Sequence, residues 1–536
     1  MMKSFKIIPI LGRKTDVPID DPTLFQFIGE SVALTHDTGG LNFDLVRKRN
    51  ACTKSNGYDN WNGTAISSAA RCQGLFELEE PTQRSHVFFD HGKMYKFDNA
   101  IVAVEVKAPS GVTLSNSDDD LYCICKVGPY LIFTDNGTNP PLRWKHGQSS
   151  FVKLIASGTS YRFKYVFPFQ RRVIGLHTDI TNGDIDVRYS TAWPTTSVEN
   201  LYFPQENQLW IPNDDTITGG SPMGQDRAFI YCRDSIQQLI YYPDYNYPFR
   251  LTTIIPQQGG YHHSIVNLGD RHYVFNRNYG FCEYRGGGEF PYGGRPISAN
   301  IDGDIENITR DAYHRIQGCF LPFKREVVWT VPLSAEDPNR LFFYNIDTKQ
   351  WRFEDKSMRF VDNWRIRTSY TWNDLITSLG GAGALWSAAS TNRWIDYIPD
   401  LVDYLVYANT NGYLYYCTGE DLNGSNINGY RIEPVLDFGD RIRRDSINEI
   451  WFDIPTTGSF SIDVSYRSGD TTGELEAASW TSIGSVSCNS SDNPVLYLPN
   501  TISSARLHQI KWGTDLKDEK FIVNGITFKY VSEGIY

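Results

Sequence analysis

Apolar residues alternate with polar ones over short stretches of the chain, and a helical period is hard to find. One example is the run Ser461-Ile462-Asp463-Val464-Ser465-Tyr466, in which every second side chain is apolar. Such alternation, enriched in β-branched and aromatic residues, is typical of strands that bury one face. Short helices are predicted only beside the glycine-rich loop at 380–383, at 372–379 and 385–389. The chain is therefore predicted to be nearly all-β.

About seven segments share one order: an apolar pair or triple, a turn with Asp or Asn and Gly, and a strand with Tyr, Phe or Trp. They lie at 88–95, 131–144, 173–189, 223–231, 273–284, 341–351 and 404–415. Their spacing of roughly 40 to 70 residues is typical of propeller blades, each made of several short strands. Blades around an axis also cover each other's apolar faces. We predict a β-propeller of about seven blades; the alternative is an array of β-sandwich domains.

The pattern becomes more regular after Tyr415. A run of about six strands opens at Ile450-Trp451-Phe452-Asp453-Ile454, and the remaining length suits one β-sandwich. The predicted organisation is thus a propeller over residues 1–430, with inserted loops near 285–295 and 370–395, and a β-sandwich over 431–536.

The charge and the cysteines limit the classes of function. The 536 residues carry 51 Lys and Arg against 62 Asp and Glu, a net charge of −11, which argues against a surface that grips nucleic-acid phosphate. No apolar stretch approaches the roughly 18 residues that a membrane-spanning helix needs. The nine cysteines are an odd number dispersed along the chain, so we expect reduced thiols, a soluble chain and synthesis in a cytoplasm.

Three groups of residues were weighed as metal ligands. Cys123 and Cys125 share one face of a strand, but no second pair stands at zinc-ligand spacing. The acidic runs 118–120 and Asp302-Gly303-Asp304 lack the terminal bidentate Glu of a calcium loop. Core thiols and solvated turns are the favoured interpretations, and we predict no metal-binding residues.

Motifs for nucleophilic catalysis and phosphate binding are incomplete. The run 219–224 misses the spacing of a nucleophile elbow and contains a proline. His262 and His263 are adjacent in a strand-like segment, where side chains on opposite faces do not easily share one metal. The glycine-rich run 285–294 lacks the Gly-Lys-Ser/Thr ending that a phosphate loop requires. We predict that the protein is not an enzyme and has no catalytic or cofactor-binding residues and no cofactor.

A glycosidase or glycan-binding propeller is the most serious alternative. Propellers host sialidases, and the chain is rich in aromatic residues able to stack on sugars. The turn Thr134-Asp135-Asn136-Gly137-Thr138 is similar to a sialidase Asp-box, although Trp144 lies too far along and no second clear copy occurs. Carboxylate separation cannot be read from sequence.

Four stretches of the chain resemble a known family. The first ends in a basic run at 45–49, the second joins the turn at 214–224 to the strand-like run at 228–236, the third covers 259–281, and the fourth joins 505–511 to 521–530. Together they resemble the β-propeller tail proteins of short-tailed bacteriophages, the nozzle or hub proteins also called packaged-DNA stabilisation proteins. The segments at 372–394 and 286–294 depart from the family's pattern.

The resemblance implies a structural virion protein of the bacteriophage tail, assembled in the host bacterial cytoplasm. It would form a ring, expected to be a homohexamer, below the portal and adaptor proteins and beside tail fibres or spikes. Genomic DNA would pass through this DNA exit channel during DNA ejection without sequence-specific binding, and the ring would help to retain packaged DNA. No membrane insertion is expected. The acidic charge is compatible with a channel that repels phosphate.

A kelch-like interaction scaffold is a third possibility. It is suggested by Tyr344-Asn345-Ile346-Asp347-Thr348 followed by Trp351, but Gly-Gly pairs do not recur at a fixed spacing. A scaffold of this kind should stay monomeric, whereas a head-to-tail interface should close into a ring.

Overall fold

The structure is a computed structural model. It describes residues 2–46, 51–61, 65–66, 71–80, 84–97, 103–154, 161–193, 201–243, 247–367, 401–409, 412–418, 422, 424–438, 442–455, 461–488, 495–497, 504–516, 519 and 521–533. The helices expected at 372–379 and 385–389, and the loop expected near 370–395, lie outside the described residues.

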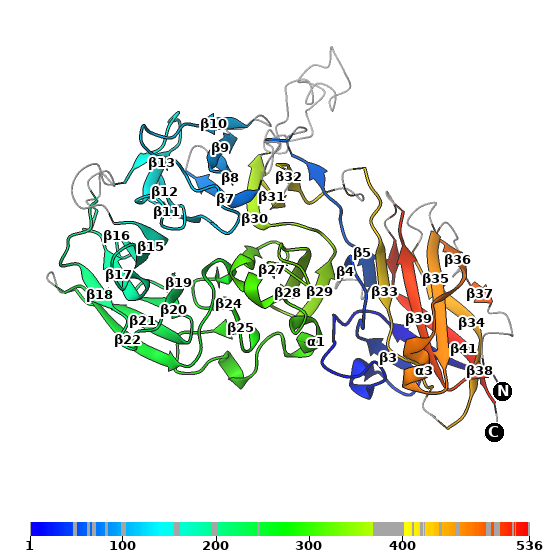
Figure 1. Ribbon diagram of the computed structural model, residues 1–536. Coiled ribbons are helices and arrows are strands. Elements are labelled where there is room, and N and C mark those ends of the chain that lie inside the picture. Colours follow the sequence, from blue (N-terminus) through cyan, green and yellow to red (C-terminus); the bar gives the residue numbers. More distant parts are fainter. Residues whose placement is uncertain are drawn as a thin grey trace, which may run out of the picture.

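Seven antiparallel sheets of three or four strands surround a common axis (Figure 1). The first strand of each sheet is innermost, because these first strands contact one another in chain order and the seventh contacts the first. A closed ring of radial sheets is a β-propeller, so this part of the predicted fold class is confirmed. Each of the seven hairpins expected from the sequence lies in a different sheet.

We number the blades in chain order. Blade 1 consists of β7 (Cys72–Glu79), β8 (Arg84–Asp90), β9 (Lys93–Phe97) and β10 (Val104–Val106). Blade 2 consists of β11 (Cys123–Val127), β12 (Tyr130–Thr134), β13 (Leu142–Lys145) and β14 (Val152–Lys153). Blade 3 consists of β15 (Phe163–Phe169), β16 (Arg172–Thr178), β17 (Asp186–Tyr189) and β18 (Gln208–Trp210), with the turn η3 (Gly183–Ile185). Blade 4 consists of β19 (Ile217–Met223), β20 (Arg227–Cys232), β21 (Ser235–Tyr241) and β22 (Phe249–Pro256), and blade 5 of β23 (Val266–Asn267), β24 (His272–Asn276) and β25 (Gly280–Tyr284). Blade 6 consists of β26 (Gln317–Leu321), β27 (Glu326–Val331), β28 (Arg340–Asn345) and β29 (Gln350–Glu354). Blade 7 consists of β30 (Phe360–Arg367), β31 (Leu401–Ala408), β32 (Leu414–Tyr416) and β6 (Asp59–Asn60).

The middle strands of the blades are buried on both faces. Every residue of β12 and β27 is buried, because the neighbouring blades cover the two sides of each sheet. Tight turns join the strands: His91 and Gly92, between β8 and β9, both have positive φ, as a two-residue hairpin turn requires. The run of apolar residues in a middle strand therefore carries no clear alternation.

Blade 7 is completed by a strand that precedes blade 1 in the chain. The pairing of β6 with β32 closes the ring through hydrogen bonds. Trp61, directly after β6, stands 5.9 Å from the ring of Trp364 in blade 7 and 5.9 Å from His86 in blade 1. This closure ties the strand that precedes blade 1 to the last blade through hydrogen bonds and ring contacts.

Replacing Trp61 by Ala is expected to destabilise the propeller by about 3 kcal/mol, because a large aromatic side chain is lost from the contact between two blades. Chemical unfolding monitored by circular dichroism measures the change. The matched control is Tyr202→Phe, an exposed aromatic position, where a change below about 0.5 kcal/mol is expected. A Trp61→Ala variant as stable as this control would contradict the closure.

Between blades 5 and 6 the chain makes an excursion in place of a fourth strand. It holds four short helical elements, η5 (Tyr292–Gly294), η6 (Ala299–Ile301), α1 (Asp302–Ile305) and η7 (Arg310–Arg315). The loop expected near 285–295 is its first part, and the sequence did not indicate that the excursion continues to residue 316. Its far end returns to the propeller axis, while α1 faces the second lobe of the molecule.

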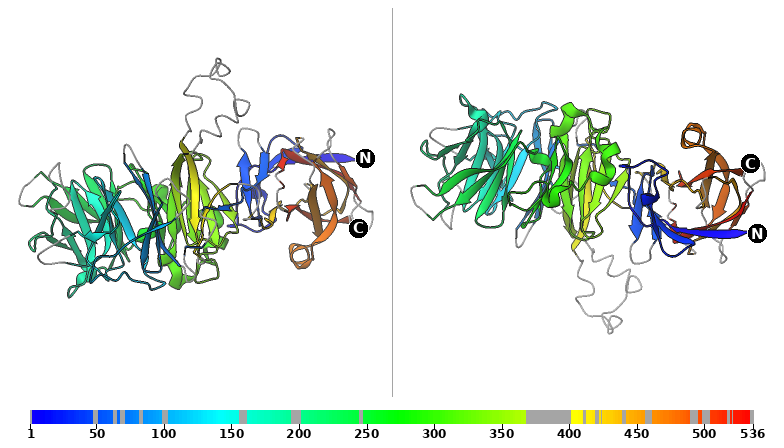
Figure 2. Two further views of the ribbon diagram at one scale, coloured as in Figure 1. Left: turned by 90° about the horizontal axis from the view of Figure 1, so that it is seen from above. Right: turned by 90° about the horizontal axis from the view of Figure 1, so that it is seen from below.

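The second lobe is a β-sandwich that lies beside blade 6 (Figures 1 and 2). Its larger sheet contains β1 (Lys3–Ile8), β2 (Phe25–Phe27), β3 (Val32–Thr35), β34 (Asp445–Asp453), β37 (Val495–Tyr497), β38 (Ser504–Ala505) and β41 (Gly525–Ser532), with the turn η1 (Pro22–Leu24) beside it. The facing sheet contains β33 (Gly429–Ile432), β35 (Ser461–Gly469), β36 (Thr481–Ser487) and β39 (Leu507–Thr514), joined by the helix α3 (Thr472–Ala477). A small third sheet contains β4 (Phe43–Val46), β5 (Ala51–Lys54) and β40 (Ile522–Val523).

The sequence-based boundary differs from this arrangement at the amino-terminal end. Residues 1–54 were assigned to the propeller, but β1 pairs with β41, and β5 pairs with β40. The sandwich therefore combines two chain segments, and its carboxy-terminal segment begins close to the expected residue 431. Strand pairing over such a separation leaves no local pattern in the sequence.

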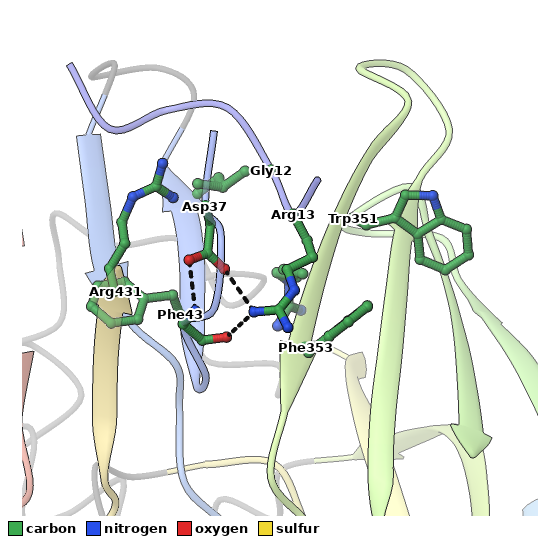
Figure 3. Close-up of a pocket in the computed structure, with 10 residues that line it drawn as sticks. Gly12, Arg13, Asp37, Phe43, Trp351, Phe353 and Arg431 are labelled. Atoms are coloured by element: carbon green, nitrogen blue, oxygen red, sulfur yellow. Dashed lines mark hydrogen bonds and ion pairs between the residues drawn. The ribbon is translucent and has the colours of Figure 1, made fainter. Parts of the chain in front are cut away.

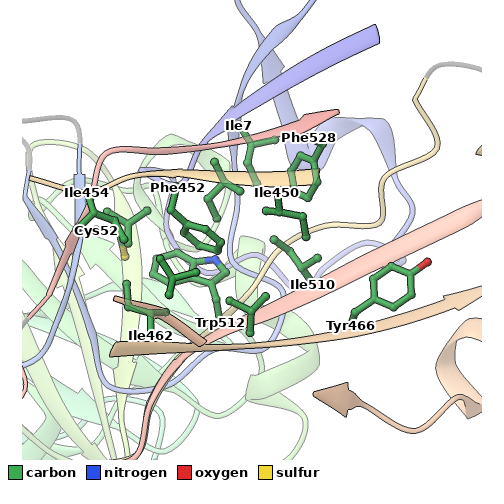
Figure 4. Close-up of a cluster of buried hydrophobic side chains, with 14 of the residues drawn as sticks. Ile7, Cys52, Ile450, Phe452, Ile454, Ile462, Tyr466, Ile510, Trp512 and Phe528 are labelled. Atoms are coloured by element: carbon green, nitrogen blue, oxygen red, sulfur yellow. The ribbon is translucent and has the colours of Figure 1, made fainter. Parts of the chain in front are cut away.

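The sandwich has its own hydrophobic core (Figure 4). Trp512, fully buried, packs edge-on against Phe43 with their ring centroids 5.2 Å apart, while Phe452 and Ile510 fill the space between the two main sheets. Because Phe43 comes from β4, the core is complete only when both chain segments are present.

Candidate functional site

The two lobes meet along the edge strand β29 of blade 6 (Figure 3). The amino-terminal segment lies against this strand: the N–H of Arg13 donates to the carbonyl of Trp351 over 2.7 Å, and the N–H of Asn42 donates to the carbonyl of Phe353 over 2.9 Å. Covering an edge strand in this way satisfies its free backbone groups. The same segment belongs to the sandwich, so it joins the lobes directly.

Arg13 stands at the centre of this junction. Its guanidinium contacts Asp304 of α1 at 3.0 Å and Asp37 at 3.6 Å, and it donates to the carbonyl of Gly40 (Figure 3). Burial alone would lower the pKa of Arg13, but the two carboxylates outweigh it and raise that pKa. Asp304, from the acidic run 302–304, therefore serves as an ion-pair partner.

A second buried network links blade 6 to β4. Arg352 contacts Glu326 at 2.8 Å, pairs with Glu354 and lies 3.5 Å from Asp44 of the sandwich. Lys324 contacts Asp44 at 2.8 Å. Burial would raise the pKa of Asp44, but the two cations lower it well below its usual value. These charges are paired across the two lobes, which favours one fixed orientation.

Replacing Arg13 by Ala is expected to lower the free energy of unfolding by about 3 kcal/mol, because Asp304 is left buried without its cation. We expect faster proteolytic cleavage between the lobes as well. Limited proteolysis and thermal unfolding measure the two effects. Arg325→Ala is the matched control, since the pair of Arg325 with Asp347 is exposed and worth about 1 kcal/mol or less. Equal effects of the two substitutions would rule out the role of Arg13 in holding the two lobes together.

The propeller axis is occupied by the chain itself at the turn η4 (His262–Ser264). His262 lies 3.0 Å from Cys123 of blade 2, and its ring packs on Tyr165 of blade 3. The ring of His263 packs on Phe360 of blade 7. A turn that contacts blades on opposite sides of the ring must lie across its centre.

Two glycines of blade 4 allow close packing, one against this turn and the other against blade 3. A Cβ at Gly219 would stand 2.6 Å from the Cα of His262, and one at Gly220 would stand 2.8 Å from the ring of Phe167. The run 219–224 is therefore part of an inner strand, β19, that lets η4 approach closely. This is a packing role, and no nucleophile elbow forms here.

Cys123 and His262 form a neutral pair. The N–H of Gly220 donates to Nδ1 of His262, which leaves the proton on Nε2 facing the sulfur of Cys123. Burial raises the pKa of the Cys123 thiol to about 12 and lowers the pKa of His262 to about 4. A reactive cysteine needs the opposite shifts, so the arrangement is structural.

Ion pairs connect several blades near the turn η4, through the neighbouring element η7. Arg315 of η7 contacts Asp119, from the loop between blades 1 and 2, at 2.5 Å, and Asp337 of blade 6 at 2.9 Å. Asp118 contacts Arg71 at 2.6 Å. Two residues of the acidic run 118–120 thus bind arginines. The sequence missed this because the partners are distant in the chain, with Asp119 and Arg315 separated by 196 positions.

Other residues weighed in the sequence also have structural roles. Asp135 is fully buried and accepts hydrogen bonds from the N–H of Asn139 (2.8 Å) and of Ser115 (3.2 Å), which fixes its turn. Trp144 is buried and donates to the carbonyl of Gln148. Gly287 and Gly288 face open space, where a Cβ would meet no atom within 4 Å.

Among the described residues, no cluster of three or more His, Cys, Asp or Glu is placed to hold a metal ion. All nine cysteines are free thiols, and Cys125 lies in the core beside Cys123. Within the same residues, no helix is long and apolar enough to cross a membrane.

No protein-family model matches the chain, and no curated protein sequence matches it. Among solved structures, it is similar to the extracellular domains of a one component system and of a hybrid two component system from B. thetaiotaomicron, each with 9% identity and a TM-score of 0.39, covering 69% and 67% of this chain and 41% and 39% of those chains. It is also similar to the WD40 repeats of RRP9, with 7% identity, a TM-score of 0.38 and coverage of 68% of this chain and 99% of that one. The chain spans about two fifths of the length of the first two structures. Likeness at this level carries no argument about function.

Proposed function

We propose that the chain is a structural protein of a bacteriophage tail, a nozzle or hub subunit that forms a ring below the portal and adaptor. The observation that carries this proposal is the turn η4 across the propeller axis, together with the clamped junction of the lobes. A propeller filled along its axis is a solid block, suited to building a wall. In such an assembly DNA would pass between subunits and not through a blade ring.

The charge of the chain supports this role. With a net charge of −11, a wall made of several copies would repel the phosphates of DNA, so that DNA could slide during ejection. The resemblance of the four sequence stretches to tail nozzle proteins supports it independently. The proposed partners are further copies of the chain, portal and adaptor proteins, and tail fibres or spikes, and the proposed location is the virion.

The test is the assembly state of the full chain. Light scattering measures its mass in solution, and negative-stain imaging shows its symmetry, with and without purified portal and adaptor. A six-fold ring that retains no duplex DNA at physiological salt is the expected result. A persistent monomer that ignores both partners would sink the proposal. Arg13→Ala serves as a second sample, since loosening the lobes should impair ring formation.

A glycan-binding propeller is the second candidate, favoured by exposed aromatic side chains near the outer edges of blades 3 and 4. Tyr202, Trp210 and Tyr247 are 53%, 44% and 74% exposed, and exposed aromatic rings can stack on sugars. A glycan array decides between the two. Specific binding by a monomer, lost in Trp210→Ala, would favour this candidate over the tail hub.

A further inference from the structure

Three arginines stand just before the inner strands of three neighbouring blades. Arg315 precedes β26 of blade 6 by two residues, Arg359 directly precedes β30 of blade 7, and Arg71 directly precedes β7 of blade 1. The inner strands contact one another around the axis, so their first residues gather at one mouth of the ring. The charged neighbours of Arg359 include Arg315, Arg71 and Asp337.

Arg359 is buried without a partner. Arg359 is 2% exposed. None of its Nε, Nη1 and Nη2 atoms has a hydrogen-bond partner in the described part of the chain. A guanidinium carries five donors, and leaving a buried charge unpaired is strongly unfavourable. Burial lowers the pKa of Arg359, which agrees with this placement. The position therefore calls for an anion.

The carboxylate beside Arg359 is already engaged. Asp337 accepts a hydrogen bond from Arg315 over 2.9 Å and lies 3.9 Å from Arg71. Asp118 and Asp119 pair with Arg71 and Arg315 in turn. Arg315 and Arg71 thus share Asp337 beside Arg359. The three aspartates equal the three arginines in number, but in the described part of the chain none of them forms a hydrogen bond with Arg359.

We propose that a free tetrahedral oxyanion, phosphate or sulfate, binds at this mouth between Arg359 and Arg71. Arginine forks match the oxygens of such an anion, while Arg315 holds Asp337 to one side. The Arg71 and Asp337 side chains are 38% and 36% exposed, so a small ion can enter beside them. A nucleic-acid chain is too bulky to bring its phosphate to Arg359, which is buried. The site is independent of the proposed function.

Equilibrium dialysis of the full chain against radiolabelled phosphate, at fixed ionic strength in chloride buffer, tests the proposal. One saturable site per chain is expected, with competition by sulfate and none by a short DNA duplex. Arg359→Met should abolish binding, and Arg71→Met should weaken it at least tenfold. Arg162→Met is the matched control, because Arg162 directly precedes β15 of blade 3 but pairs with Asp179 at the surface; its affinity should equal that of the unmodified chain.

Thermal unfolding gives a second measurement, which can be made on the unmodified chain even where a variant fails to fold. In chloride alone, the melting temperature of Arg359→Met should equal or exceed that of the unmodified chain, since an unpaired charge has been removed. Added phosphate should raise the melting temperature of the unmodified chain only. Binding of phosphate that survives in both Arg359→Met and Arg71→Met would mean an adventitious ion only. No saturable binding at all would show that water alone satisfies Arg359. Either result overturns the proposal, and competition by DNA would overturn the restriction to a free ion.

Discussion

Acidification from pH 7 to pH 5 is expected to destabilise the protein, with His272 and His508 alone contributing roughly 4 kcal/mol. Both side chains are fully buried, and burial lowers the pKa of each to about 4. An unfolded histidine takes up a proton near pH 6.5, whereas these two do so only near pH 4 in the folded protein. Between these values the unfolded state binds more protons, so stability is lost as the pH falls.

The surroundings of these histidines favour the neutral ring. Nε2–H of His272 donates to the carbonyl of Pro222 over 2.9 Å, and Nδ1 accepts from the hydroxyl of Tyr231 over 3.0 Å. Nδ1 of His508 lies 2.7 Å from the hydroxyl of Tyr466. Burial also lowers the pKa of His36 and His262 to about 4, which adds to the same effect.

Two carboxyl groups act in the opposite direction. Burial raises the pKa of Asp90 to about 6 and that of Asp362 to about 7. Each takes up its proton at a higher pH in the folded protein than in the unfolded one, so each stabilises the fold as the pH falls. Asp90 contributes about 1 kcal/mol over this range. The more numerous histidines outweigh these carboxyls, and the net effect is destabilisation.

Urea unfolding at pH 7, 6 and 5 measures this dependence. A His272→Gln/His508→Gln variant should lose markedly less stability between pH 7 and pH 5 than the unmodified chain, whatever its stability at pH 7. His91→Asn is the control, because His91 is exposed in a turn with positive φ that Asn accepts. An unchanged slope in the double variant would show that these histidines are not the cause.

Replacing Arg431 by Met is expected to cost about 3 to 5 kcal/mol of sandwich stability. Its Nε contacts Glu433, which is fully buried, at 2.9 Å, and its Nη2 donates to the carbonyls of Leu11 and Thr35. Burial opposes the charge of Arg431, but the pKa of Arg431 is still raised, because Glu433 outweighs the burial. The substitution leaves Glu433 buried without its cation.

The same reasoning predicts a partial rescue. Adding Glu433→Gln to Arg431→Met should recover about half of the loss. The amide oxygen can still accept from Trp512, which donates over 2.9 Å to one oxygen of Glu433, and the amide N–H can donate to the hydroxyl of Thr35, which lies 2.7 Å from the other. Hydrogen exchange of peptides that contain β39, followed during chemical unfolding, reports on this lobe. Lys6→Met, which removes an exposed pair with Asp453 in the same lobe, should change stability by less than about 1 kcal/mol. A double variant less stable than Arg431→Met would contradict the account.

The sequence predicted the propeller because each blade contains a hairpin whose signal is local. Turns such as His91-Gly92 between two apolar runs could be recognised without any knowledge of distant contacts. The first sandwich strands could not, since β1 acquires its role only by pairing with β41. Composition and alternation are the same in both kinds of strand, so the boundary at the amino-terminal end was missed.

The roles of the site residues were likewise predicted only where they do not depend on distant partners. That Cys123 and Cys125 are core thiols agrees with the interpretation made from the sequence. The acidic runs were expected to be solvated turns, but Asp304 is buried against Arg13 and Asp119 contacts Arg315. Oppositely charged partners far apart in the chain leave no spacing signal. Arg359 could not be singled out either, because its lack of a partner is a property of the folded state.

The pairing of β1 with β41 also sets an order of events during synthesis. The strand at residues 3–8 is made before blade 1, yet its partner at 525–532 follows only after all seven blades have been made. Non-local pairing of this kind is slow to form. β3 can pair with one edge of β1 early, but the other edge must remain open while the propeller folds. A chain halted before β41 keeps this open sheet edge, which quality-control proteases and chaperones can recognise.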